Sequence, residues 1–285
     1  MNWATEWLDD APGEGAVPDA TSAPTGMDAD PSSAAETETA GDQDIEMALP
    51  IPAAAGPSGV LVAGVCGGAG ATCSALTLAA ALGTAQVAAV AAVDATADGG
   101  DLLERGYGED VPAGEWVFSE GVLWGRRALG SPDGESLAAA STHALLGAAG
   151  YLPIYDAGST LRARRLAPLL VDRALAIVLV VASRGDSVNR LPGQLEWIQS
   201  TLGEEALGSV VVVVASTRPG QTPVAEHLRA HLGNRVGAIC EISHEASLAS
   251  GGPVRWNELS EQIQGDFEQL AKTVRNVGDA WVARP

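Results

Sequence analysis

Lysine is almost absent from this chain. The sequence has 285 residues, and Lys272 is its only lysine beside 15 arginines. Preference for arginine, together with abundant alanine, glycine and valine, is typical of proteins from GC-rich genomes. Acidic residues outnumber basic ones by 36 to 16, which gives a formal net charge of −20. A protein this acidic is a poor candidate for binding DNA phosphates without sequence preference, and anionic lipid surfaces repel it.

Long apolar runs and cysteines are also scarce. No run reaches the roughly 18 apolar residues of a membrane span, and the acidic N-terminus lacks the apolar segment of a signal peptide. The three cysteines are an odd number, and two of them, Cys66 and Cys73, flank a glycine-rich loop. This arrangement argues against a disulfide framework. We therefore expect a cytoplasmic protein.

Basic residues are missing altogether from residues 1–57. This segment has seven aspartates and five glutamates and is rich in alanine, proline, glycine, serine and threonine. Such a composition predicts an acidic disordered tail. Within it, Trp3, Trp7 and Leu8 have the spacing of one face of a short helix. Two interpretations stay open: a docking peptide for a protein partner, or a solvated chain end with chance aromatics.

Residues 58–285 alternate predicted strands and helices and are expected to form one domain. The strands lack polar alternation, which predicts burial on both faces of a sheet. Strands that alternate with helices favour an α/β fold with a mainly parallel, doubly wound sheet. We expect strands at 60–65, 87–93, 151–155, 174–182, 209–215 and 236–242, and helices at 71–82, 136–149, 161–173, 191–202, 224–232 and 258–281. Trp116 and Trp124 are expected in a loop or a short helix.

The first strand leads into a glycine-rich loop. Residues 66–73 read CGGAGATC and precede an apolar helix. Strand, glycine loop and helix follow one another as in a phosphate-binding loop, whose backbone N–H groups and helix N-terminus hold phosphate oxygens. The lysine that such a loop carries before Thr72 is Ala71 here. Asp94 and Asp156 end two predicted strands, at the edge of a parallel sheet where ligands bind.

Together these motifs resemble the MinD/ParA family of P-loop ATPases over about residues 58–270. The family loop K-G-G-x-G-K-[ST]-[ST] is matched at three glycines and at the threonine, whereas its two lysines are Cys66 and Ala71. The family's water-positioning aspartate falls on Thr96. The asparagine that contacts adenine in the family is missing from the segment that starts at Ala215.

The resemblance implies a site for ATP or ADP with Mg²⁺, bound weakly, or a site that has lost its ligand. Its implied nucleotide-binding residues are Gly67, Gly68, Gly70, Ala71, Thr72, Cys73, Asp94 and Asp156. Thr72 and Asp156 are the implied metal ligands. No catalytic residue is assigned, because the loss of one preorganised donor commonly slows a reaction about 10²–10³-fold. Arg105, Arg126 and Arg184 are candidates to provide the missing positive charge.

Within the family, the loop and the segment after Asp94 are most similar to the CpaE/TadZ type, which organises Flp pili and related secretion machines. This similarity implies a spatial organiser or adaptor with weak or no ATP hydrolysis. It also implies protein partners, bound through the tail or the domain surface, a homodimer, and recruitment to membrane or pole by a partner. The alternative is a working ParA/MinD-type ATPase in partitioning or cell-division positioning that uses compensating residues.

Three further features have a structural and a functional interpretation. Cys66 and Cys73 are expected as small apolar fillers rather than redox thiols. His227 and His231, four residues apart, are expected on a solvated helix face rather than in a metal site. The last helix is expected to pack on the sheet rather than on a membrane. Its apolar stripe consists of Ile263, Phe267, Leu270 and Val274.

Overall fold

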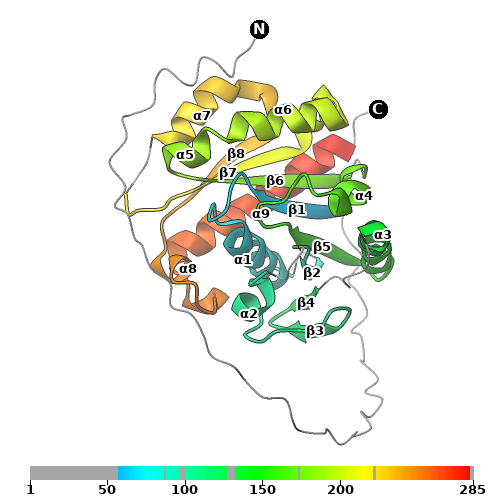
Figure 1. Ribbon diagram of the computed structural model, residues 1–285. Coiled ribbons are helices and arrows are strands. Elements are labelled where there is room, and N and C mark those ends of the chain that lie inside the picture. Colours follow the sequence, from blue (N-terminus) through cyan, green and yellow to red (C-terminus); the bar gives the residue numbers. More distant parts are fainter. Residues whose placement is uncertain are drawn as a thin grey trace, which may run out of the picture.

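The computed structural model describes residues 57–86, 88–96, 100–126, 132–172, 174–220 and 223–282, so the predicted docking segment at Trp3, Trp7 and Leu8 lies outside the described residues. The strands are β1 (Gly59–Gly64), β2 (Ala89–Asp94), β3 (Trp116–Ser119), β4 (Val122–Arg126), β5 (Tyr151–Asp156), β6 (Leu175–Ala182), β7 (Val210–Ala215) and β8 (Ala238–Ile242). They form one sheet in the order β3-β4-β2-β5-β1-β6-β7-β8 (Figure 1). All neighbouring pairs are parallel except β3 and β4. This arrangement confirms the predicted α/β fold.

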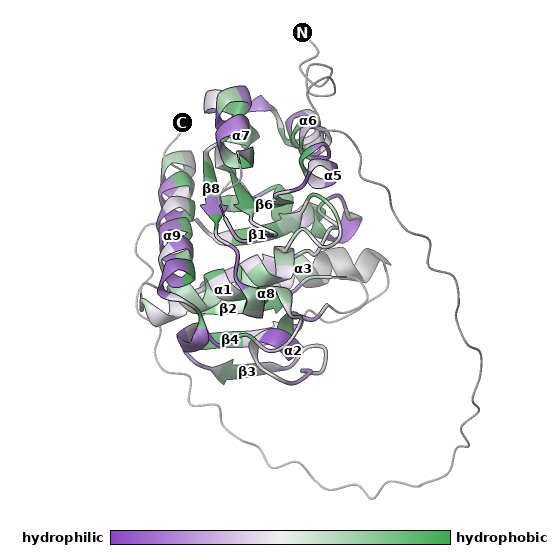
Figure 2. Ribbon diagram, turned by 90° about the vertical axis from the view of Figure 1, so that its left-hand side faces the viewer, coloured by the Kyte–Doolittle hydropathy of each residue, from purple (hydrophilic) through white to green (hydrophobic). Residues whose placement is uncertain are grey.

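Helices cover both faces of the sheet (Figure 1). The described helices are α1 (Ala71–Thr84), α2 (Leu102–Gly106), α3 (Pro132–Ala148), α4 (Ala167–Leu170), α5 (Gly185–Val188), α6 (Leu191–Leu202), α7 (Val224–Leu232), α8 (Ala246–Ala249) and α9 (Glu261–Val282). Residues of α1, α2 and α9 share a core with Val60 and Val62 of β1. Residues of α3, α4, α6 and α7 share a second core with Leu61 and Ala63. Successive β1 side chains therefore enter opposite cores, and Figure 2 shows the hydrophobic strands between the more polar helices.

The last helix packs on the sheet, as its apolar stripe predicts. Ile263, Phe267, Leu270 and Val274 are all buried in the core that contains α1. Helix α9 begins at Glu261, three residues after the predicted start, because residues 256–258 form a separate 3₁₀ turn. Within the described part of the chain, no helix combines the length and the apolar character that crossing a bilayer requires.

The prediction for Trp116 and Trp124 was wrong, because both lie in strands of an antiparallel hairpin, β3 and β4. Glu120 and Gly121 connect these strands with φ angles of 51° and 79°. Two consecutive positive φ values are the mark of a type I′ turn, whose twist suits a two-residue hairpin. Glutamate is an uncommon first residue for this turn, so the sequence carries little signal for it.

The helix predicted over residues 161–173 is shorter in the structure. A 3₁₀ turn at Arg164–Leu166 leads into α4, which is only four residues long. Pro168 lies in the first turn of α4. Proline has no N–H to donate and fits only the start of a helix, so residues before it do not continue one regular helix.

Candidate functional site

The glycine loop connects the carboxyl end of β1 to the N-terminus of α1. Gly68 and Gly70 have φ angles of 70° and 96°, which only glycine adopts without strain. Gly70 occupies the N-cap of α1, and no side chain caps the helix there. The first backbone N–H groups of α1 are therefore oriented toward the loop without a side-chain acceptor. This geometry suits a phosphate or another oxyanion.

The two positions where the family has lysine contribute no charge. The Sγ atom of Cys66 lies 3.5 Å from the Oγ atom of Ser187 in α5, the short helix that follows β6. Ala71 is buried in the first turn of α1. The loop therefore keeps the backbone geometry of a phosphate site without its cations.

Asp156 lies at the carboxyl end of β5 beside the loop and is completely buried. Its Oδ1 atom accepts a hydrogen bond from the Gly158 N–H at 2.9 Å. Its Oδ2 atom has no hydrogen-bond partner among the described residues. Burial raises the pKa of Asp156 to about 6, against the lowering effects of Gly158 and Thr72, and the charge of Asp94 raises it further. A buried carboxylate oxygen without a partner is a suitable ligand for a cation.

Thr72 lies in the first turn of α1, close to the Asp156 carboxyl group. A threonine hydroxyl and an aspartate oxygen are both hard oxygen ligands, which is the type that Mg²⁺ prefers. The residues present therefore fit a Mg²⁺ ion bound through Thr72 and Asp156.

Asp94 is engaged differently from Asp156. Its Oδ1 atom accepts hydrogen bonds from the N–H and hydroxyl of Thr96, at 2.9 and 2.6 Å. Its Oδ2 atom accepts from the Gly100 N–H at 2.8 Å and from Arg126 Nε at 3.3 Å. Because four donors surround this buried carboxylate, its visible role is to hold the segment after β2.

The three candidate arginines have different environments. The Arg105 side chain is buried and donates to the Sγ atom of Cys73 at 3.1 Å and to the Leu248 carbonyl at 2.9 Å. Arg126 forms ion pairs with Asp94 and with Asp110, the latter at 2.8 Å. Both guanidinium groups are thus bound by the protein itself.

Arg184, in contrast, lies against the glycine loop. Its Nη2 atom is 3.4 Å from the carbonyl oxygen of Gly67. A Cβ atom placed on Gly68 would lie 3.8 Å from the same nitrogen. Arg184 is therefore the candidate arginine that the structure brings to the loop.

Cys73 is a structural thiol by its contacts. Its Sγ atom donates to the Leu248 carbonyl at 3.4 Å while it accepts from Arg105. Burial raises the pKa of the Cys73 thiol, although the Arg105 charge acts in the opposite direction. A thiol with a raised pKa is a weak nucleophile at neutral pH.

The rings of the two histidines of α7 contact each other with an interplanar angle of 39°. The ring centroids of His227 and His231 are 3.9 Å apart, and His231 Nδ1 contacts the His227 carbonyl at 2.8 Å. In the described parts of the chain, no group of three or more histidine, cysteine, aspartate or glutamate residues could hold a metal ion.

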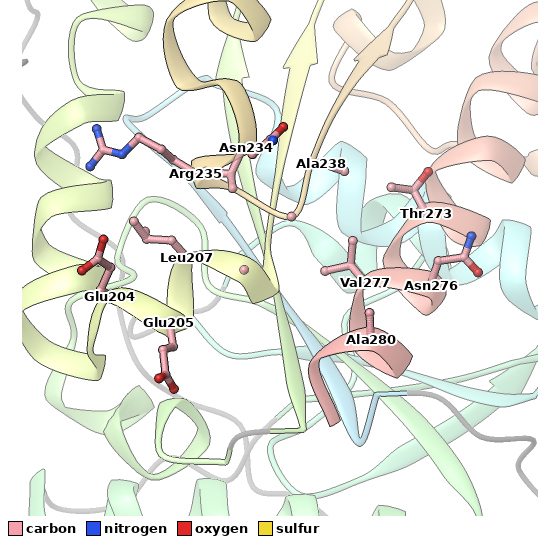
Figure 3. Close-up of a pocket in the computed structure, with 13 residues that line it drawn as sticks. Glu204, Glu205, Leu207, Asn234, Arg235, Ala238, Thr273, Asn276, Val277 and Ala280 are labelled. Carbon is pink, nitrogen blue, oxygen red and sulfur yellow. The ribbon is translucent and has the colours of Figure 1, made fainter. Parts of the chain in front are cut away.

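A cavity of about 840 Å³ lies at the opposite end of the sheet, where β7 and β8 begin (Figure 3). Glu204, Asn234 and Arg235 border it on one side, and Thr273 and Asn276 of α9 on the other (Figure 3). The glycine loop follows the carboxyl end of β1, so this cavity is separate from the candidate nucleotide site.

This chain resembles known proteins in its structure. No protein-family model matches the chain, and no curated protein sequence matches it. A ParA family ATPase from Chlorobium tepidum matches with a TM-score of 0.60 and 15% identity, over 77% of this chain and 99% of that one. The chain has the fold of ParA-type ATPases.

Two further structures support this result. An ATP complex of a McdA variant from Cyanothece has a TM-score of 0.57 and 16% identity, over 78% of this chain and 97% of that one. MinD in a MinC:MinD cell division complex from Aquifex aeolicus has a TM-score of 0.54 and 13% identity, over 75% of this chain and 95% of the other. At these identities the similarity establishes the ParA/MinD fold, and the activity has to be argued from the site.

The contacts of Ser183, Arg184, Thr217 and Arg218 were largely missed by sequence reasoning. These four residues line a cavity of about 520 Å³ at the carboxyl ends of β6 and β7. The available signal was their position, since Ser183 and Arg184 directly follow β6, and Thr217 and Arg218 come two and three residues after the end of β7.

Proposed function

We propose that this protein is a nucleotide-binding organiser or adaptor with a ParA/MinD fold and weak or no ATP hydrolysis. The observation that carries the proposal is the buried Asp156 carboxylate, which lies close to Thr72 at the glycine loop. Its Oδ2 atom has no hydrogen-bond partner within the described residues. Such a group is costly to keep in a protein unless a ligand satisfies it. The proposed site residues are those implied by the family resemblance, with Thr72 and Asp156 as ligands of Mg²⁺.

The argument for slow hydrolysis rests on residues that the loop and the β2 segment lack. Neither Cys66 nor Ala71 can neutralise phosphate charge, and phosphoryl transfer is catalysed mainly by positioning and electrostatics. The Thr96 hydroxyl donates to Asp94, and threonine is no base for orienting water. Bound Mg²⁺ would neutralise phosphate charge, while this chain's residues contribute the loop amides and the two metal ligands.

The finer proposal is a role of the CpaE/TadZ type, in which the protein organises a secretion or pilus machine or a polar assembly. The motif similarity of the loop supports it, and so does the fold similarity to MinD, which was solved in complex with MinC. We propose that residues 58–285 form the nucleotide-binding domain, and that residues 1–57 form an acidic tail whose Trp3/Trp7/Leu8 segment binds the partner. Any homodimer would form without nucleotide, because Cys66 replaces the lysine that acts across the family's interface.

Calorimetry on the full chain tests nucleotide binding. We expect Mg·ATP to bind the wild type at about 100 μM or tighter, as for weak ligand sites, and Asp156→Ala to weaken binding at least about tenfold. Glu226→Ala, on the exposed face of α7, is the control for loss of one acidic charge. No binding to the wild type would reduce the proposal to an interaction protein with an empty site.

A working ATPase is the second candidate, and the position of Arg184 against the glycine loop favours it. Radiolabelled ATP turnover discriminates the two candidates. Turnover in the wild type that disappears in Asp156→Ala would establish the ATPase, whereas equal background in both proteins would exclude it.

A further inference from the structure

The candidate nucleotide site has a deficit of positive charge. Asp94 and Asp156 are both buried beside it, and the loop provides no lysine. A nucleoside triphosphate adds about three to four negative charges. Binding through backbone amides and one Mg²⁺ alone would leave repulsion between the phosphates and the two aspartates uncompensated. The question is which cations of this chain can reach the phosphates.

Most arginines near the loop are already bound within the protein. Arg105 and Arg126 are held as described above, and buried Arg165 donates to the Ala95 carbonyl at 3.1 Å and to Thr160 Oγ1 at 2.7 Å. Moving any of them toward a ligand would break buried hydrogen bonds. They therefore stabilise the framework and leave the ligand to other residues.

Two arginines in the segments after β6 and β7 remain accessible. The Arg184 side chain is 45% exposed, and Arg218 is exposed and forms no hydrogen bond or ion pair with the part of the chain that the structure describes. Because β6 and β7 are parallel neighbours, both residues emerge at the same edge of the sheet as the glycine loop.

Hydrogen bonds hold these two segments together. The Ser183 N–H donates to the Ala215 carbonyl at 2.9 Å, and the Thr217 N–H donates to Ser183 Oγ at 3.0 Å. The hydroxyls of Ser183 and Thr217 are 3.3 Å apart. The cavity between the segments, of about 520 Å³, is lined by these two hydroxyls and by Arg184 and Arg218. Every side chain that lines it can donate a hydrogen bond, and none is acidic.

Asp186 orients one of the arginines. Its Oδ1 atom is 3.0 Å from Arg184 Nε, while Arg184 Nη2 faces Gly67. A guanidinium group has five N–H donors in a fixed fork, so the contacts with Asp186 and Gly67 leave further donors for an anion.

We propose that Arg184 and Arg218 bind the phosphate chain of the nucleotide and replace the lysines missing from the glycine loop. The site takes a polyphosphate that lies between the N-terminus of α1 and the cavity between the β6 and β7 segments. The inference rests on the proposed function, because it concerns the same nucleotide, and it assigns the cationic residues and the chemical class of the ligand.

The test is calorimetry of full-length protein with tripolyphosphate, Mg·ATP and adenosine, each in about 2 mM Mg²⁺ and about 100 mM salt. The variants are Arg184→Ala, Arg218→Ala and the double variant, with Arg184→Lys to keep charge without the fork. Arg190→Ala is the matched control, because Arg190 is exposed in the same region but does not line the cavity. We expect tripolyphosphate to bind the wild type, the single variants to lose about 10- to 100-fold, and Arg190→Ala to lose less than about twofold.

The outcomes separate this inference from the proposed function. Equal binding of Mg·ATP by wild type and double variant would overturn the inference and leave the nucleotide site standing. Tripolyphosphate binding that depends on both arginines, with no binding of Mg·ATP, would support the anion site and overturn the nucleotide function. A loss as large in Arg190→Ala, or no tripolyphosphate binding to the wild type, would overturn the inference by itself.

Discussion

The hydroxyl of Thr96 donates a hydrogen bond to the Asp94 carboxylate at 2.6 Å. In the family that the motifs resemble, the position of Thr96 is an aspartate that positions the attacking water. Here the side chain is directed at its neighbour two residues earlier. At the position where the resemblance implies a reactive carboxylate, this chain therefore has a hydroxyl group that forms a structural hydrogen bond.

The first prediction concerns the hydrogen bond between Thr96 and Asp94. Thr96→Ala removes the hydroxyl donor but leaves the Thr96 backbone N–H and Gly100 N–H bonds to the carboxylate. We expect a loss of about 1–2 kcal/mol in the free energy of unfolding, as for a hydrogen bond to a charged group. Urea denaturation measures it. Thr96→Ser keeps the hydroxyl and is expected to differ little from wild type, and an unchanged Thr96→Ala would show that the bond contributes no stability.

The sequence predicted the framework of the fold because its strands are apolar on both faces. Helices α6 and α7 have the predicted bounds, since Pro192 marks the start of one and glycines follow the ends of both. The β3–β4 hairpin escaped prediction because its turn, Glu120-Gly121, is an uncommon type I′ pair. Trp124 of β4 packs closely against Gly106 of α2, which is a contact between residues distant in sequence.

The candidate site was predictable to the level of the loop and the two strand-end aspartates. The sequence did not predict which of the two carboxylates has all its hydrogen bonds within the protein. Asp94 accepts them from Thr96, Gly100 and Arg126 through contacts that depend on the folded chain. The choice among arginines likewise depends on which guanidinium groups the core binds.

The second prediction is a pH dependence that comes from Asp156. The folded pKa is raised from 3.8 to about 6, so the folded protein binds a proton more tightly than the unfolded chain does. The stability from the protonated carboxyl is present below pH 3.8 and is lost as the pH rises through about 6. Asp156→Asn abolishes this change. Without Mg²⁺, we therefore expect the variant to gain about 2–3 kcal/mol on wild type between pH 4 and pH 7.

The same pair of proteins also tests whether Asp156 binds the metal. At pH 7, millimolar Mg²⁺ with nucleotide is expected to stabilise the wild type and to leave Asp156→Asn unchanged, because ligand binding to the folded state adds stability by mass action. Thermal melts of both proteins from pH 4 to pH 7, and at pH 7 with and without Mg²⁺ and nucleotide, measure the two changes in stability. A difference between wild type and variant that is flat from pH 4 to pH 7 would contradict the raised pKa.

The third prediction concerns the contact between α2 and β4. A Cβ atom on Gly106 would lie 2.3 Å from the Trp124 ring, a distance at which the rigid indole has to move. Gly106→Ala is expected to lower the free energy of unfolding by about 1–3 kcal/mol, as overpacking does. Gly265→Ala is the matched control, because Gly265 lies within α9 with nothing near its Cβ position. There the same change is expected to add about 0.5–1 kcal/mol of stability. Equal effects at the two glycines would contradict the close contact.

The fourth prediction restores a lysine to the glycine loop. Ala71→Lys places an ammonium group in the first turn of α1, where the resemblance implies contact with the terminal phosphates. We expect Mg·ATP to bind about tenfold or more tightly, as for one charge-assisted hydrogen bond. Turnover is expected to rise far less than affinity, because Thr96 still occupies the position of the water-positioning aspartate. Calorimetry and phosphate release measure the two effects on the same protein.

Ala85→Lys is the control for added charge, since Ala85 is exposed at the other end of α1. Its effect on ATP affinity is expected to stay within about twofold, because a solvated charge several turns away is screened. A comparable gain in both variants would mean that net charge, rather than the loop position, limits binding. If Ala71→Lys alone produced rapid turnover, Thr96 would be no obstacle to hydrolysis, and the missing lysine alone would account for weak activity.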